Sequence, residues 1–178
     1  MKSLRSIALL IPVLVFSVSP LLAQDKPRVS PQDTVNATVD GAKITIVYGR
    51  PYTKDPKSGE KRKIWGGLVP FGKVWRMGAN EATILTTDKD ITIGGTAVAA
   101  GSYSLFLLPE GTGAKLIVNK QTGQWGTKYD EAQDLARIDL KKEAASKAVD
   151  QFTIAVDGST LKLSWEDVVY TAAIAAKK

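Results

Sequence analysis

The stretch from Asp150 to Trp165, DQFTIAVDGSTLKLSW, decides the fold class. Apolar side chains recur at every second position in both of its halves, which is the period of a half-buried β-strand. Asp157-Gly158-Ser159 separates the halves, and a short glycine-containing turn between two such runs is typical of a β-hairpin. The stretch therefore predicts two antiparallel strands whose apolar side chains share one face: Phe152, Ile154, Val156, Leu161, Leu163 and Trp165.

Similar alternating runs lie on the N-terminal side of this hairpin, separated by turn signals such as Asp40-Gly41 and Gly94-Gly95. The run at 134–143, DLARIDLKKE, favours a strand, although residues 129–138 could also be interpreted as a helix. We expect one all-β domain over residues 34–176, preceded by an extended N-terminal arm at 24–33. The spacing of the turns predicts an antiparallel β-sandwich of about 8–10 strands, jelly-roll or immunoglobulin-like.

The first 23 residues have the pattern of a secretory signal peptide. Lys2 and Arg5 precede an apolar run at 7–18, and the small residue Ala23 follows as a cleavage position. A membrane anchor is the alternative, but the run is shorter than the roughly 20 apolar residues that a spanning helix needs. We therefore expect an exported protein, periplasmic or extracellular, with no membrane span after cleavage.

The chain contains no cysteine and no histidine. Without cysteine, an exported domain must rely on its core and not on disulfides. Without histidine, the catalytic triads that use it and the usual zinc, copper and haem ligands are excluded. We expect neither a metal nor a cofactor, and near-neutral proton transfer would need a carboxylate, lysine or tyrosine with a shifted pKa.

The positive charge of the chain does not indicate nucleic-acid binding. The net charge is +6, and it falls to +4 when residues 1–23, which hold two basic residues and no acid, are removed. The lysines are scattered, with no basic block that alternates with aromatic residues. The charge is consistent with solubility alone.

The segment 63–83, KIWGGLVPFGKVWRMGANEAT, is the candidate site. It has more turn residues than a connection between two strands requires, and loops of this length are often functional. Arg76 could pair with Glu81, or it could present its guanidinium to a carboxylate, a phosphate or sugar hydroxyls. Alternatively, Arg76, Asn80 and Glu81 form a buried polar cluster that satisfies the backbone of the loop.

Three of the four tryptophans lie in turn-rich segments, and the fourth, Trp165, ends a strand and is expected in the core. Exposed tryptophans could stack on a sugar ring or an apolar ligand, and Trp125 is the best placed for that. Alternatively, each tryptophan caps an open end of the sandwich, with its indole N–H bonded to a carbonyl. The candidate ligand-binding residues are Arg50, Trp65, Trp75, Arg76, Asn80, Glu81 and Trp125.

Several motifs occur in a characteristic order along the chain. They are KITIVYGRP, KRKIWGGLVPFGKVWRMGANEAT, DITIGG, AGSYSLFLLPE, VNKQTGQWG and YDEAQDLARI. This run resembles an exported bacterial family, the domain of unknown function 2911, over nearly all of the chain after the signal peptide. The resemblance implies an exported, β-rich protein, but it implies no activity and supplies no catalytic residues.

Three hypotheses for function follow. The first is a non-catalytic binding module for a glycan or a small polar or anionic ligand. The second is a histidine-free hydrolase with Glu81 as its acid/base, which requires a second carboxylate or a tyrosine nearby and a raised pKa of Glu81. The third is a structural envelope protein, which predicts a filled polar cluster and an exposed apolar patch, for example on residues 168–176.

Overall fold

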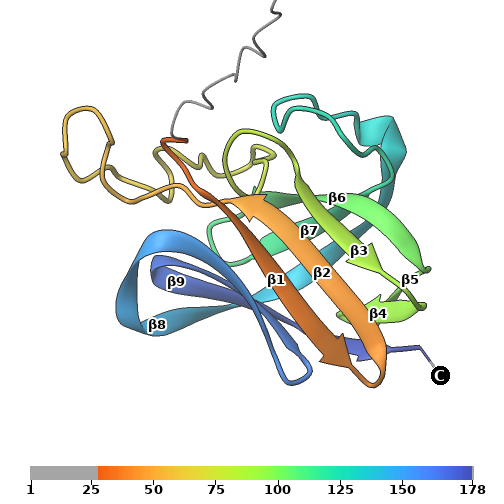
Figure 1. Ribbon diagram of the computed structural model, residues 1–178. Coiled ribbons are helices and arrows are strands. Elements are labelled where there is room, and N and C mark those ends of the chain that lie inside the picture. The colour runs from red at the N-terminus through yellow and green to blue at the C-terminus, as the bar shows by residue number, and fades with distance from the viewer. Residues whose placement is uncertain (1–27, 178) are drawn as a thin grey trace, which may run out of the picture.

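The computed structural model describes residues 28–177 (Figure 1). The expected signal peptide and residues 24–27 of the expected arm lie outside this range. The all-β prediction is confirmed, since nine strands form one antiparallel sheet in the order β1-β2-β3-β6-β7-β8-β9-β4-β5. The strands are β1 (Gln32–Val39), β2 (Ala42–Gly49), β3 (Thr83–Thr87), β4 (Ile91–Ile93), β5 (Thr96–Val98), β6 (Gly101–Pro109), β7 (Ala114–Asn119), β8 (Asp134–Asp157) and β9 (Thr160–Ala176).

The long strand β8 folds the sheet over on itself. Its first residues pair with β7, as in Ala114↔Leu140, and the rest pair with β9 as far as Asp157↔Thr160. In Figure 1, β8 and β9 curl away from the layer formed by β1, β2, β3, β6 and β7. The result is a sandwich-like arrangement in which one continuous sheet encloses the core.

The strand β8 is one continuous strand of 24 residues, whereas the sequence suggests two separate strands at 134–143 and 150–157. Backbone pairing with β9 continues from Lys141 to Ala144, where the side chains are charged or small. The register then shifts between Ala144 and Thr153. The side chains in this part of β8 are mostly exposed, so apolar and polar residues do not alternate. The strand continues all the same, because its hydrogen bonds are made by the backbone.

The hairpin that decided the fold class has the expected register. Ile154 lies opposite Leu163 and Val156 lies opposite Leu161. Phe152 and Trp165 are fully buried, with ring centroids 5.8 Å apart, which confirms that Trp165 belongs to the core. The only helical segment among residues 28–177 is the 3-10 turn Glu131–Gln133, so the alternative helix at 129–138 is wrong.

One end of the sheet holds the candidate site. Because β2 and β3 are antiparallel neighbours, the end of β2 at Gly49 and the start of β3 at Thr83 lie at the same end. The loops of residues 50–82 and 120–133 both connect strands at this end, as Figure 1 shows in yellow and teal. Within the described residues, no helix is long and apolar enough to cross a membrane.

Candidate functional site

The segment 76–80, RMGAN, turns sharply, and the backbone at the end of β2 packs closely against it. Met77 and Asn80 have positive φ angles of 48° and 65°, a conformation that non-glycine residues seldom adopt. A Cβ atom added at Gly49 would lie 2.2 Å from the carbonyl oxygen of Ala79. Glycine at 49 is therefore required for the end of β2 to approach this segment so closely.

A second glycine makes room for the side chain of Arg76. A Cβ atom added at Gly126 would lie 2.5 Å from Cδ of Arg76 and 2.8 Å from the carbonyl oxygen of Asn80. The backbone N–H of Gly126 donates a hydrogen bond to that carbonyl at 2.9 Å. The loop of residues 120–133 thus lies against the aliphatic part of Arg76 and limits where its guanidinium can point.

Arg76 has no electrostatic partner within residues 28–177. Its Nε–H is buried without a hydrogen-bond acceptor, and no ion pair or hydrogen bond of its guanidinium occurs in that range. Burial lowers the pKa of Arg76 from its ordinary value, because desolvation disfavours the charged form. An arginine nevertheless stays protonated, so a partly desolvated positive charge is left uncompensated.

Arg76 lines an open cavity of about 370 Å³, here called the Arg76 pocket, and also a smaller cavity of about 210 Å³ on the side of Gly126. The polar or charged side chains among its lining residues are Ser30, Tyr52, Arg62, Arg76 and Asn80. The apolar ones are Val29, Pro51, Pro56, Leu68, Trp75, Ala79 and Trp165. Two arginines and no acidic residue line this pocket, so its charge favours an anion.

Two of the tryptophans, Trp75 and Trp165, line one side of the pocket, here called its wall, and connect it with the core. Trp75 and Trp165 are stacked, with ring centroids 5.6 Å apart and an interplanar angle of 23°. Trp65 meets Trp75 edge to face at 6.4 Å and donates its indole N–H to the carbonyl of Trp165 at 3.3 Å. Trp65 thus adopts the capping arrangement that the sequence left open as an alternative.

The structure brings together three of the seven candidate residues at the Arg76 pocket, namely Trp75, Arg76 and Asn80. Trp65 packs behind this wall and is not among the lining residues. Arg50 also lies elsewhere, because it donates hydrogen bonds to the carbonyl of Phe152, to Asp33 and to Thr153.

Glu81 and Trp125 lie beside each other but outside the pocket lining. They are joined by an isolated antiparallel bridge, and the side chain of Trp125 is 50% exposed. Glu81 pairs with Arg28 at 2.7 Å, so neither the possible pair of Arg76 with Glu81 nor the alternative buried cluster of Arg76, Asn80 and Glu81 is formed. The hydrogen bond from Arg28 lowers the pKa of Glu81, which is the opposite of what an acid/base catalyst needs.

Sequence reasoning missed the residues that the preceding loop brings to the pocket. Tyr52 and Arg62 line it, although neither is among the candidate binding residues. Arg62 is oriented by hydrogen bonds to the backbone carbonyls of Tyr52 and Thr53. The sequence shows an aromatic and a cationic residue in a loop that contains Pro51 and Pro56. It does not show that this loop packs against the segment 75–80.

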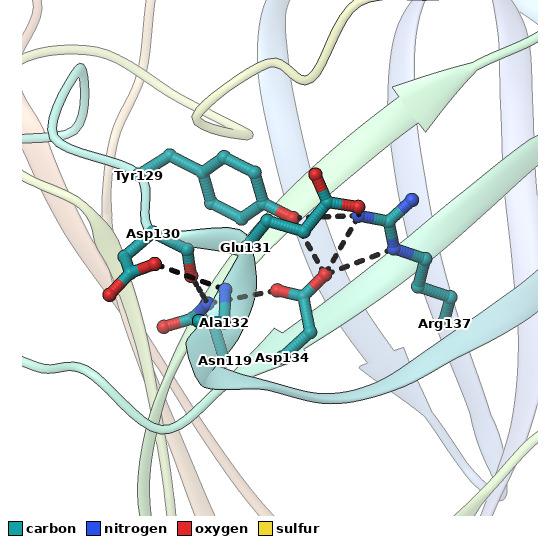
Figure 2. Close-up of polar contacts among 7 residues, drawn as sticks. All are labelled: Asn119, Tyr129, Asp130, Glu131, Ala132, Asp134 and Arg137. Carbon is teal, nitrogen blue, oxygen red and sulfur yellow. Dashed lines mark hydrogen bonds and ion pairs between the residues drawn. The ribbon is translucent and has the colours of Figure 1, made fainter.

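A separate polar network lies at the start of β8 (Figure 2). The hydroxyl of Tyr129 donates to Asp134 at 2.6 Å, and Arg137 donates to Asp134, to Tyr129 and to Glu131. Asn119 donates to the other oxygen of Asp134 at 2.9 Å. Because each charged group in the network has a partner, its geometry is that of a structural support for the loop.

The network predicts a pH dependence of stability at alkaline pH. Burial and the hydrogen bond to Asp134 raise the pKa of Tyr129 to about 12, whereas a tyrosine in an unfolded chain titrates near about 10. The folded state therefore holds this proton over a pH range where the unfolded state loses it, and the free energy of unfolding should fall as pH rises through this range.

Urea unfolding of wild type and Tyr129→Phe at several alkaline pH values tests this prediction. The free energy of unfolding should decline less steeply with pH in the variant than in wild type. Equal slopes would contradict the assignment.

No metal centre is formed by the side chains that the structure describes. Among residues 28–177, no three His, Cys, Asp or Glu side chains gather where they could hold a metal ion. The acidic side chains at 130, 131 and 134 are engaged with Asn119, Arg137 and the N–H of Ala132.

The fold and the site define an antiparallel, sandwich-like β-domain with a cationic pocket in the loops at one end. The family model described as Protein of unknown function (DUF2911) matches residues 30–174. The chain belongs to this family, which confirms the resemblance seen in the sequence. Comparisons with curated proteins and with solved structures give no significant match.

Proposed function

We propose that this protein is a non-catalytic binding module for a small anionic ligand, which it holds in the Arg76 pocket. The proposal rests on one observation, the partly buried guanidinium of Arg76 that has no acceptor among the described residues. Leaving a buried charged donor unpaired is costly, so such groups usually have a partner. A bound carboxylate or phosphate would supply that partner through charge-assisted hydrogen bonds.

The surroundings of Arg76 also support this proposal. Arg62 adds a second positive charge, and Asn80 places a side-chain amide at the same pocket. The volume of about 370 Å³ lies at the lower end of the range for small-molecule sites. In contrast, the lowered pKa of Glu81 does not support catalysis, and residues 168–176 include several buried side chains where the structural hypothesis needs an exposed patch.

The proposal is tested by calorimetric titration of the purified protein with acetate, inorganic phosphate and uncharged polyols. We expect saturable binding of at least one anion, and we expect it to weaken as salt is added, because the charges at an open pocket are screened. Polyols should give no signal of comparable strength. If neither these anions nor longer carboxylates bind, or if binding is independent of salt, the proposal fails.

A glycan remains the second candidate ligand, at a different place. Trp125 is half exposed and could offer an aromatic face to a sugar ring. It does not line the Arg76 pocket, so the two candidates can be separated. Glycan binding that is lost in Trp125→Ala and retained in Arg76→Met would favour the second candidate.

The proposed setting of this function is outside the cytoplasm. The pattern of residues 1–23 supports export, and the chain without them has no cysteine that would need a disulfide partner there. Cell fractionation tests it, since export predicts that the protein accumulates in the periplasm or the medium, shortened at its N-terminus.

A further inference from the structure

Exposed apolar side chains are concentrated at the Arg76 pocket. Residues 28–177 contain six large aliphatic or aromatic side chains that are exposed, and three of these line this one pocket. Val29 is 63% exposed, Leu68 43% and Tyr52 39%. Single exposed apolar residues are ordinary on a protein surface, but a group of them around a concave site indicates a contact surface.

Two of the polar side chains at the pocket already have partners within the protein. The amide of Asn80 is directed at the carbonyl of Ser30, at 3.5 Å. Arg62 already donates to the two backbone carbonyls at 52 and 53. Arg76 is the lining cation whose guanidinium has no acceptor among the described residues, and Trp75 adds an apolar side chain beside it. One anionic group and an apolar body match this arrangement better than a sugar does.

We infer that the ligand is an organic acid with an apolar body, whose carboxylate pairs with Arg76 while its body lies against Leu68, Tyr52 and Val29. The inference rests on the proposed function and specifies the class of its ligand. The carboxylate fits the planar donor set of a guanidinium. The apolar body covers side chains that are otherwise exposed to water, and burial of both surfaces stabilises the complex.

The test is a calorimetric series of straight-chain acids, from acetate through butyrate and hexanoate to octanoate, with octanol as the uncharged match. We expect affinity to rise roughly three- to fourfold for each methylene group that becomes buried. Octanol should bind much more weakly than octanoate, because it cannot pair with Arg76. Equal affinity for acetate and octanoate would overturn the inference but leave the proposed function standing.

A pair of leucine variants locates the apolar contact. Leu68→Ser should weaken octanoate binding several-fold and leave acetate binding unchanged. Leu135→Ser is the matched control, because Leu135 is similarly exposed at 39% and does not line the pocket. An equal loss in both variants, or no loss in Leu68→Ser, would contradict the inferred placement. If no acid binds at all, both the inference and the proposed function fail.

Discussion

Arg76→Met is expected to weaken anion binding by about 10- to 150-fold, since hydrogen bonds to charged groups contribute about 1.5–3 kcal/mol. Methionine keeps much of the length of the side chain, so the packing of its aliphatic part against Gly126 is retained. The free energy of unfolding should stay the same or increase, because the substitution removes a buried donor without an acceptor. Calorimetric titration and urea unfolding of the same preparations measure both effects.

Arg137→Met is the matched control for this prediction. Arg137 lies outside the pocket and forms ion pairs with Glu131 at 2.6 Å and Asp134 at 2.9 Å (Figure 2). This variant should retain anion binding and lose stability, the opposite of the result expected for Arg76→Met. If Arg76→Met instead unfolds the protein and anion binding is unaffected wherever the variant is folded, Arg76 is a structural residue and the pocket is not a site.

Gly49→Ala is expected to destabilise the protein by about 3 kcal/mol or more, which places it among severe substitutions. The added Cβ atom would lie 2.2 Å from the carbonyl oxygen of Ala79 and 2.9 Å from its carbonyl carbon. Both contacts are with backbone, so no side-chain rotation relieves them. Either β2 or the segment 76–80 must move, and that segment carries Arg76.

The measurement is urea unfolding, with Gly111→Ala as the control. A Cβ atom at Gly111 would meet no atom within 4 Å, and Gly111 does not have a positive φ angle. The control should change the free energy of unfolding by no more than about 0.5 kcal/mol. If Gly49→Ala is as stable as Gly111→Ala, the close approach of β2 to the segment 76–80 does not exist in solution. A Gly49→Ala variant that remains folded should also bind anions more weakly.

Local patterns in the sequence were sufficient to predict the all-β class and the hairpin at 150–165. Alternation and a glycine turn involve neighbouring residues, so they are visible without knowledge of the rest of the chain. The same reasoning could not show that β8 continues through 144–149, because exposed side chains there carry no apolar period.

The candidate site was only partly visible in the same way. The turn-rich segment 63–83 directed attention to Trp75, Arg76 and Asn80, which do lie together. Proximity in sequence was misleading for Glu81, because its partner Arg28 lies 53 residues before it in the chain. It was equally misleading for Arg50, whose partners at 33, 152 and 153 are brought to it by β1 and β8.

The all-β class, the main hairpin and the burial of Trp165 follow from the sequence, because each depends on the period of side chains along one strand. The composition of the Arg76 pocket was decided by the tertiary structure alone. Parts of the segments 29–30, 51–68 and 75–80 meet there with Trp165 only because the sheet folds over through β8 and places several loops at one end. Whether an arginine has a partner depends on contacts between such distant segments. For this reason Arg50 and Arg76, similar as sequence signals, have opposite surroundings: Arg50 is bonded within the protein, and Arg76 is left to face a pocket.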